Sequence, residues 1–236
     1  MCNGSTKDFD SFCGGSNPPG STNFASTKQQ KGLLMSLKDN FIQILKKVNR
    51  DSIDTVIVKL TEGGFFEAPA STRYHGNYPG GLVEHSLNVY EQAMYLLKIE
   101  QKVRKDVVKD ITEENIIVAS LLHDVCKMDL YHLTKKWKKD ENNKWVQYDA
   151  YEKKYESMPL GHGEKSVIRL MSWGFPLQEQ EMLAIRWHMG GFDLSTYQDS
   201  QRSFETASEE PLVALIVAAD WLASRIKEKD VKADDN

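Results

Sequence analysis

The chain has 236 residues, of which 40% are hydrophobic and 27% charged, as in an ordinary globular protein. This length allows one domain with a substantial core, or at most two small domains. The net charge of −4 argues against non-specific binding to duplex nucleic acid, because such binding usually needs a basic surface. Residues 1–30 lack the apolar segment of a secretory signal, and the longest apolar run, residues 212–219, is too short to span a bilayer. We therefore expect a cytoplasmic protein that does not contact a membrane.

Residues 1–31 are rich in Gly, Ser, Asn, Thr, Pro and Lys, and they contain too few apolar side chains to form a core. We expect them to form a flexible tail, followed by one domain over residues 32–230 and a short C-terminal tail over residues 231–236. Three cysteines, two of them in the N-terminal tail, do not make a disulfide framework.

Apolar residues recur at helical spacing over most of the expected domain. The pattern predicts helices over residues 33–48, 53–60, 82–97, 112–128, 163–173, 177–189 and 212–227. The second of these also fits a strand over residues 55–59. Aromatic residues on both sides of Asn142 and Asn143 predict a β-hairpin over residues 135–151. Residues 190–210 are polar and predict a loop. The helices together with the one hairpin predict an all-α bundle with a small β-hairpin excursion.

The segment ASLLHDVCKM, residues 119–128, ends a strongly apolar run with adjacent His123 and Asp124. An imidazole and a carboxylate that flank one point are natural ligands for a divalent cation. In a single helix the two side chains would point about 100° apart, so a shared ligand would have to lie between them. Taken alone, such a pair is more often a packed histidine and a capping aspartate.

Other polar residues also stand beside strongly apolar sequence. His85, His162 and His188 lie at expected helix ends or in adjoining turns, where core packing does not require histidine. Asp220 lies in the most apolar helix, LVALIVAADWLA, where an ionised carboxylate is costly unless it is paired or metal-bound. The alternative is that Asp220 faces solvent or hydrogen-bonds a nearby Arg or Trp.

The order His85, His123-Asp124, Asp220 resembles the H…HD…D pattern of the HD-domain metal-dependent phosphohydrolases. The resemblance covers about residues 65–226, with the motifs GGLVEHSLNV, SLLHDVCK and AADW in order. That family forms all-α bundles, in agreement with the independent helix prediction. One departure is Cys126, where many relatives carry glycine. This thiol could be redox-sensitive or packed and inert.

The resemblance implies a metal centre. One divalent cation would be held by His85, His123, Asp124 and Asp220. His162 and His188 are similar to the two extra histidines of the subset of the family that binds two metals, and Asp124 would bridge the two ions. Imidazole and carboxylate ligands favour Mn, Fe, Co, Ni or Zn over Mg. The implied reaction is hydrolysis of a phosphomonoester or phosphodiester, with a nucleotide as the expected small phosphorylated substrate.

Other residues near the motifs are candidates for contact with the substrate. By the resemblance, Lys127 would offset charge at the scissile phosphate; the alternative is a solvated helix end. Arg73 and His75 could contact the same phosphate or protonate the leaving oxygen. Tyr74, Tyr78 and Trp187 could stack on a base, or simply pack.

The role of Glu164, two alternative functions and the oligomeric state stay open in the sequence. Glu164 could orient His162 or be a first-turn acid favoured by the helix dipole. A 3′–5′ exonuclease acting on single-stranded nucleic acid is an alternative, but such enzymes usually carry a separate binding module. A metal-binding regulatory domain without turnover is a second alternative. The oligomeric state is not predicted.

Overall fold

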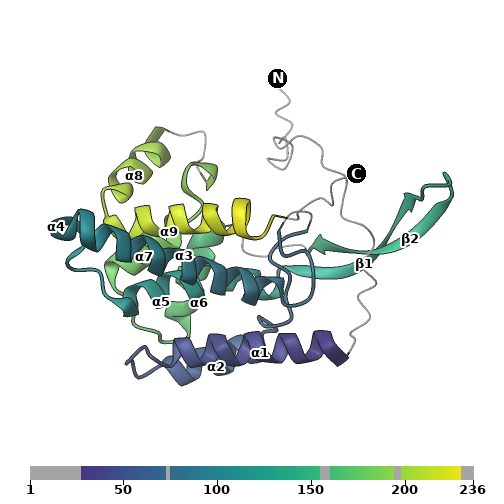
Figure 1. The fold of residues 1–236 in the computed structure, drawn as a ribbon, viewed down its shortest axis with the longest axis horizontal. Coiled ribbons are helices and arrows are strands. Elements are labelled where there is room, and N and C mark those ends of the chain that lie inside the picture. Colours follow the sequence, from purple (N-terminus) through teal and green to yellow (C-terminus); the bar gives the residue numbers. More distant parts are fainter. Residues whose placement is uncertain (1–27, 73–74, 155–159, 194–197, 230–236) are drawn as a thin grey trace.

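The computed structural model describes residues 28–72, 75–154, 160–193 and 198–229. This part of the chain is a bundle of helices from which one two-stranded antiparallel sheet projects (Figure 1). The predicted all-α fold class is thereby confirmed. The elements, in chain order, are α1 (Lys28–Leu45), α2 (Ile53–Glu62), α3 (Gly81–Val103), α4 (Lys105–Val108), α5 (Glu113–Leu122), η2 (Val125–Asp129), β1 (Tyr131–Lys139), β2 (Trp145–Lys153), α6 (His162–Ser172), α7 (Glu179–Trp187), η3 (Gly190–Asp193), α8 (Gln198–Ser208), α9 (Pro211–Leu222) and η4 (Ala223–Lys227). No helix in these described ranges is both long and apolar enough to cross a membrane.

Helix α5 is the centre of the bundle. Its residues from Asn115 to Leu122 are all buried, as expected for a helix that is apolar on every side. Ile117 and Leu121 pack into a core with α1, α2 and α3, whereas Ile116 and Ala119 pack into a second core with α7 and α9. The end of α5 is therefore fixed from several sides.

The start of α5 agrees with the prediction, but its end does not. Thr112 caps the helix, with its hydroxyl accepting from the backbone N–H of Asn115. The predicted continuation to residue 128 is wrong, because the α-helix ends at Leu122 and a 3₁₀ helix, η2, begins at Val125. Asp124 leaves helical geometry with φ −108° and ψ 21°. This break lets neighbouring side chains, which would diverge on a continuous helix, contact each other.

The predicted hairpin is confirmed and is longer than expected. β1 and β2 pair from Tyr131 opposite Lys153 to Lys139 opposite Trp145. Asn143 takes the left-handed conformation in the turn, at φ 63°, which asparagine tolerates better than most residues. At its root, the N–H of Lys154 donates to the carbonyl of Leu130 (2.9 Å), so the hairpin follows η2 directly.

The predicted loop over residues 190–210 is wrong in its second half, where residues 198–208 form α8. This helix is polar except at a few positions, so its apolar periodicity is faint. Phe204 packs against Trp187 of α7, with ring centroids 5.5 Å apart. α1 also begins at Lys28, inside the segment expected to be the N-terminal tail.

A buried ionic cluster joins α5 to α7. Arg50, in the connection between α1 and α2, donates to both carboxylate oxygens of Glu181 (2.6 and 2.7 Å), and the Glu181 side chain is fully buried. The amide of Asn115 donates to the same carboxylate (2.9 Å). A buried carboxylate depends on such partners, because an unpaired charge in the interior is strongly destabilising.

We expect Arg50→Met to lower the free energy of unfolding by about 3–5 kcal/mol, because it leaves the Glu181 carboxylate buried and without its cation. The matched control is Lys47→Met, which removes the 3.0 Å ion pair with Glu113. The side chains of Lys47 and Glu113 are both half-exposed. That change should cost less than about 1 kcal/mol. Urea unfolding at neutral pH measures both, and equal effects would contradict the role given to the buried pair.

Candidate metal centre

Five polar side chains from four helical segments meet below the surface of the bundle. His85 comes from the start of α3, His123 and Asp124 from the end of α5, His188 from the residue after α7, and Asp220 from α9. All five are buried, the most exposed being Asp220 at 8%. The packing of α3 against α5 and α9, and of α7 against both, brings these distant residues together.

Asp124 lies at the middle of this group. Its Oδ2 is 3.2 Å from Nε2 of His123 and 4.0 Å from Nε2 of His85. Its Oδ1 faces His188, with Nε2 at 3.5 Å. Asp220 approaches from the other side of His85, with Oδ1 3.1 Å from Nε2. The two oxygens of Asp124 therefore face different histidines.

Two of the rings are held in one tautomer by the backbone. Nδ1 of His123 lies 2.7 Å from the carbonyl oxygen of Ser120, and Nδ1 of His188 lies 2.8 Å from that of Ile185. A carbonyl oxygen can only accept, so Nδ1 carries the hydrogen and Nε2 presents its lone pair to the centre. Histidines that bind metals are typically oriented in this way.

The donor set fits a divalent cation. Nε2 of His123, Nε2 of His188 and Oδ1 of Asp124 are buried, and none has a hydrogen-bond partner in the described part of the chain. Buried polar atoms without partners are rare, and each needs an explanation. A cation among these atoms would satisfy all of them at once. Independently, ligating atoms of His85, His123 and Asp124 all lie within 4.8 Å of one another.

Glu228 holds the third histidine, and the sequence analysis did not identify it. Both of its carboxylate oxygens lie 3.1 Å from Nδ1 of His85, and the amide of Asn88 donates to it (2.9 Å). It follows η4, a π-helical turn that continues α9, and such turns often occur at functional sites. In the sequence Glu228 stands in a run of charged residues that reads as a solvated helix end.

Burial and charge act in opposite directions on the ionisable groups. Burial alone would raise the pKa of Asp124, but the positive charge of Lys127 holds it well below its usual value. Lys127 donates to Asp124 Oδ2 (2.6 Å). Burial alone would lower the pKa of His85, yet hydrogen bonds to Asp220 and Glu228 raise it to about 10. A proton and a metal ion are alternative occupants of its Nε2.

His162 lies beside this group at the first position of α6. Nδ1 of His162 is 3.9 Å from the sulfur of Cys126. Helix α6 can start this close to the end of α7 because residue 163 is glycine. A Cβ at Gly163 would lie 2.3 Å from the carbonyl oxygen of Arg186 and would clash with it. Any larger residue at this position would push His162 away from the other histidines.

The electrostatic surroundings of His162 and Cys126 keep both uncharged at neutral pH. Burial and the positive charge of Lys127 lower the pKa of His162 to about 4, and Asp124 opposes this only in part. Burial raises the pKa of the Cys126 thiol to about 11. A protonated, buried thiol is a weak nucleophile, which favours the packed and inert alternative for Cys126.

Of the side chains expected to contact the substrate, His75 lies beside the buried histidines and Tyr78 lies at the surface. The ring of His75 lies against that of His85, with centroids 4.8 Å apart, and burial together with the charge of His85 lowers its pKa to about 4. Tyr78 is exposed and its hydroxyl donates to Glu84 (2.8 Å). Arg73 and Tyr74 lie outside the described residues.

Trp187 and Glu164 both contact other side chains of the bundle. Trp187 is buried against Phe204, so its proposed stacking on a base is wrong. Glu164 accepts from the N–H of Gly161 (3.0 Å) and pairs with Arg186 (2.8 Å). It therefore caps α6 as a first-turn acid and does not orient His162.

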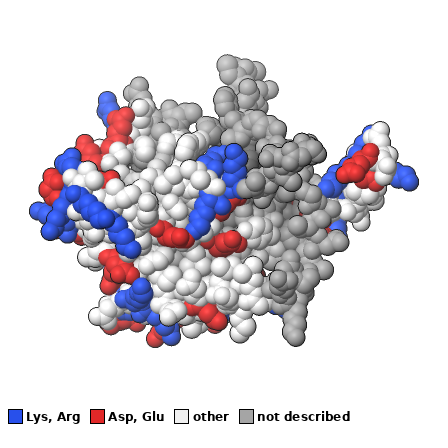
Figure 2. All heavy atoms as spheres, viewed as in Figure 1, with Lys and Arg blue, Asp and Glu red and all other residues white. Residues whose placement is uncertain are grey.

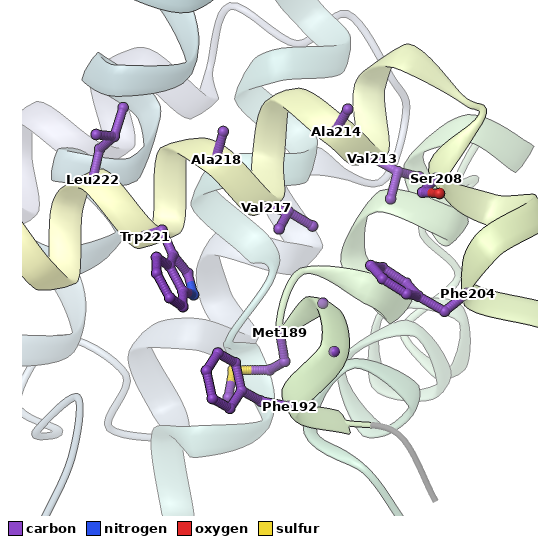
Figure 3. A pocket seen from close by; sticks show the side chains of 12 residues that line it. Met189, Phe192, Phe204, Ser208, Val213, Ala214, Val217, Ala218, Trp221 and Leu222 are labelled. Atoms are coloured by element: carbon purple, nitrogen blue, oxygen red, sulfur yellow. The ribbon is translucent and has the colours of Figure 1, made fainter. Parts of the chain in front are cut away.

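An apolar cavity of about 560 Å³ lies between η3, α8 and α9 (Figure 3). Phe192 and Trp221 stack on each other at one end, and Phe204 lies at the other. The lining of the cavity includes Met189 and Trp221, which follow His188 and Asp220 in the sequence. None of the five polar residues of the buried group lines it. The cavity is therefore separate from the candidate metal centre.

Comparison with known proteins identifies the class. A family model described as HD domain matches residues 82–225, more than half of the chain, so the chain belongs to the HD-domain family. It is similar to a dihydroneopterin 2′,3′-cyclic phosphate phosphodiesterase of Methanocaldococcus jannaschii, with 29% identity over 118 residues. That match covers 50% of this chain and 41% of the relative, so the chain spans less than half of the relative's length. No solved structure matches.

We expect Glu228→Ala to weaken the binding of Mn²⁺ about 10–100-fold, because His85 would lose the carboxylate that fixes its ring. Glu228→Gln, whose side-chain oxygen can still accept from Nδ1, should retain most of the affinity. Isothermal titration measures both. The matched control is Glu91→Ala, which removes the exposed partner of Lys227 on the same side of the bundle. Unchanged binding in Glu228→Ala would show that Glu228 does not position His85.

Proposed function

We propose that this protein is a metal-dependent phosphohydrolase that cleaves a phosphomonoester or phosphodiester bond of a nucleotide-like substrate. The observation that carries the proposal is the arrangement around Asp124. The Nε2 atoms of three histidines converge on this ionised carboxylate, and their Nδ1 atoms are occupied by Ser120, Ile185 and Glu228. His123 and His188 turn the lone pairs of Nε2 inward, which a cluster built only for packing does not require.

The donor set supports two cations. His85, His123, Asp124 and Asp220 would hold one cation. Asp124 would bridge to a second, held with His162 and His188. The division is supported by the way Oδ2 of Asp124 faces His123 while Oδ1 faces His188. With imidazoles as most of the ligands, Mn, Fe, Co, Ni or Zn is favoured over Mg.

Ions held by these residues would supply an activated water and offset charge on the phosphate oxygens. The protein's own groups do the rest. Lys127 holds its ammonium against Asp124, where it can also stabilise a phosphate beside the carboxylate. His75 is uncharged at neutral pH, because its pKa lies near 4, and so it is suited to hydrogen-bond a substrate oxygen as a neutral ring.

The relative supports the phosphodiesterase form of the proposal. Its name describes the hydrolysis of a 2′,3′-cyclic phosphate, a small phosphodiester. A regulatory domain without turnover is less well supported, because every residue of the family's metal-binding pattern is present and oriented. The small cyclic phosphodiester is therefore the first substrate class to test.

We expect the purified chain with Mn²⁺ to hydrolyse bis(p-nitrophenyl) phosphate and 2′,3′-cyclic nucleotides. Asp124→Ala should lower the rate by about a thousandfold or more, because it removes the group that joins the ligands. Asp129→Ala, on the same 3₁₀ helix, removes an exposed partner of Arg169 and should leave the rate unchanged. Circular dichroism would show that each variant folds. Hydrolysis by Asp124→Ala at the parent rate would rule out the proposal.

A further inference from the structure

The β-hairpin differs in charge from the rest of the molecule. Residues 131–154 contain seven lysines and four acidic residues, a net charge of +3 in a chain whose total is −4. The hairpin projects from the helical body, and Figure 2 shows lysines on both sides of a small acidic group at its tip. A basic arm is thus attached to an acidic body.

The same hairpin exposes large aromatic side chains on one face. Cross-strand partners in an antiparallel pair point to the same side, and every second residue does so along a strand. Trp137 therefore shares a face with Trp145, the partner of Lys139, and with Tyr151, the partner of Leu133. Trp137 is 59% and Trp145 64% exposed, and Tyr151 is partly buried. The three rings extend over about 20 Å, six residues of strand.

Some of the lysines contact rings and not carboxylates. Nζ of Lys139 lies 5.7 Å from the ring centroid of Trp145, and Nζ of Lys138 lies 5.2 Å from that of Tyr148. By contrast, Lys135 and Lys136 pair with Asp149 and Glu152 across the strands. Lys139 and Trp145 share the face of Trp137, whereas Lys138 and Tyr148 lie on the opposite face, so each face of the hairpin carries positive charge beside an aromatic ring.

The root of the hairpin adjoins the candidate metal centre. β1 begins two residues after η2, which carries Lys127, and the two elements pack together. The hydrogen bond between Lys154 and Leu130 closes the root beside the same segment. A chain lying along the hairpin would therefore lead towards Asp124.

We propose that the face with Trp137, Trp145 and Tyr151 binds single-stranded nucleic acid. Bases can stack on exposed rings whatever their sequence, while lysines neutralise the phosphates. A duplex keeps its bases stacked inside and would meet only the lysines of a narrow arm on an acidic body. A second copy of the hairpin would bring like charges together. The proposal is independent of the proposed hydrolysis.

The test is fluorescence anisotropy of labelled 12-nucleotide oligo(U) and oligo(dT) with the full chain in low salt, with EDTA present to prevent hydrolysis. The double variant Trp137→Ala/Trp145→Ala should bind at least about tenfold more weakly. The double variant Lys138→Glu/Lys139→Glu should also bind more weakly and show a smaller salt dependence. The control Trp221→Ala removes an exposed tryptophan of α9 and should leave the affinity unchanged.

Three results would overturn the proposal. These are no binding by the parent chain, equal binding by the hairpin variants, or equal affinity for a duplex of the same length. A concentration-dependent dimer in light scattering that the tryptophan variants lose, without oligonucleotide binding, would assign the face to a second copy. Each of these outcomes can occur whether or not Asp124→Ala abolishes hydrolysis, so the two proposals fail separately.

Discussion

The candidate metal centre depends on the contacts of the Asp124 carboxylate with the groups around it. A buried carboxylate is stable only with compensating charge, and Lys127 at 2.6 Å supplies part of it. His123 and His188, as neutral rings with the hydrogen on Nδ1, supply no charge. A cation would complete this arrangement, and the buried helix α5 fixes the position of the His123 and Asp124 side chains that would hold it.

The ends of two helices contribute to the same place. His123 and His188 are the C-cap residues of α5 and α7, and each ring contacts a carbonyl three residues earlier. The carbonyl end of a helix carries partial negative charge, which favours a nearby cation. The Arg50–Glu181–Asn115 cluster ties these two helices together near their starts. Local capping and long-range packing thus serve one geometry.

Much of this could be predicted from the sequence. The apolar periodicity predicts most of the helices, and the aromatic residues around Asn142 predict the hairpin. Asp220 was identified because a carboxylate in so apolar a helix is costly without a partner, and its Oδ1 lies 3.1 Å from Nε2 of His85. These features depend on residues close together in the sequence or on a strong violation of burial.

The remaining features depend on contacts that sequence periodicity does not encode. The break after Leu122 follows from the packing of η2, and residues 122–128 could continue a helix by their own propensities. Glu228 reaches His85 only because η4 turns its backbone, and in the sequence it is one acid in a charged run. α8 has too few apolar residues to be distinguished from a polar loop. In each case tertiary packing, not local pattern, decides the structure.

A crystal structure of the chain grown with Mn²⁺ tests most directly whether Asp124 joins two cations. We expect two anomalous-scattering peaks, one between Oδ2 of Asp124 and His85, His123 and Asp220, and one between Oδ1 and His188 with His162. A separation of about 3.5–4 Å is expected for a pair that shares a carboxylate. A single peak would contradict the bridge, and manganese bound without Asp124 would contradict the metal centre as a whole.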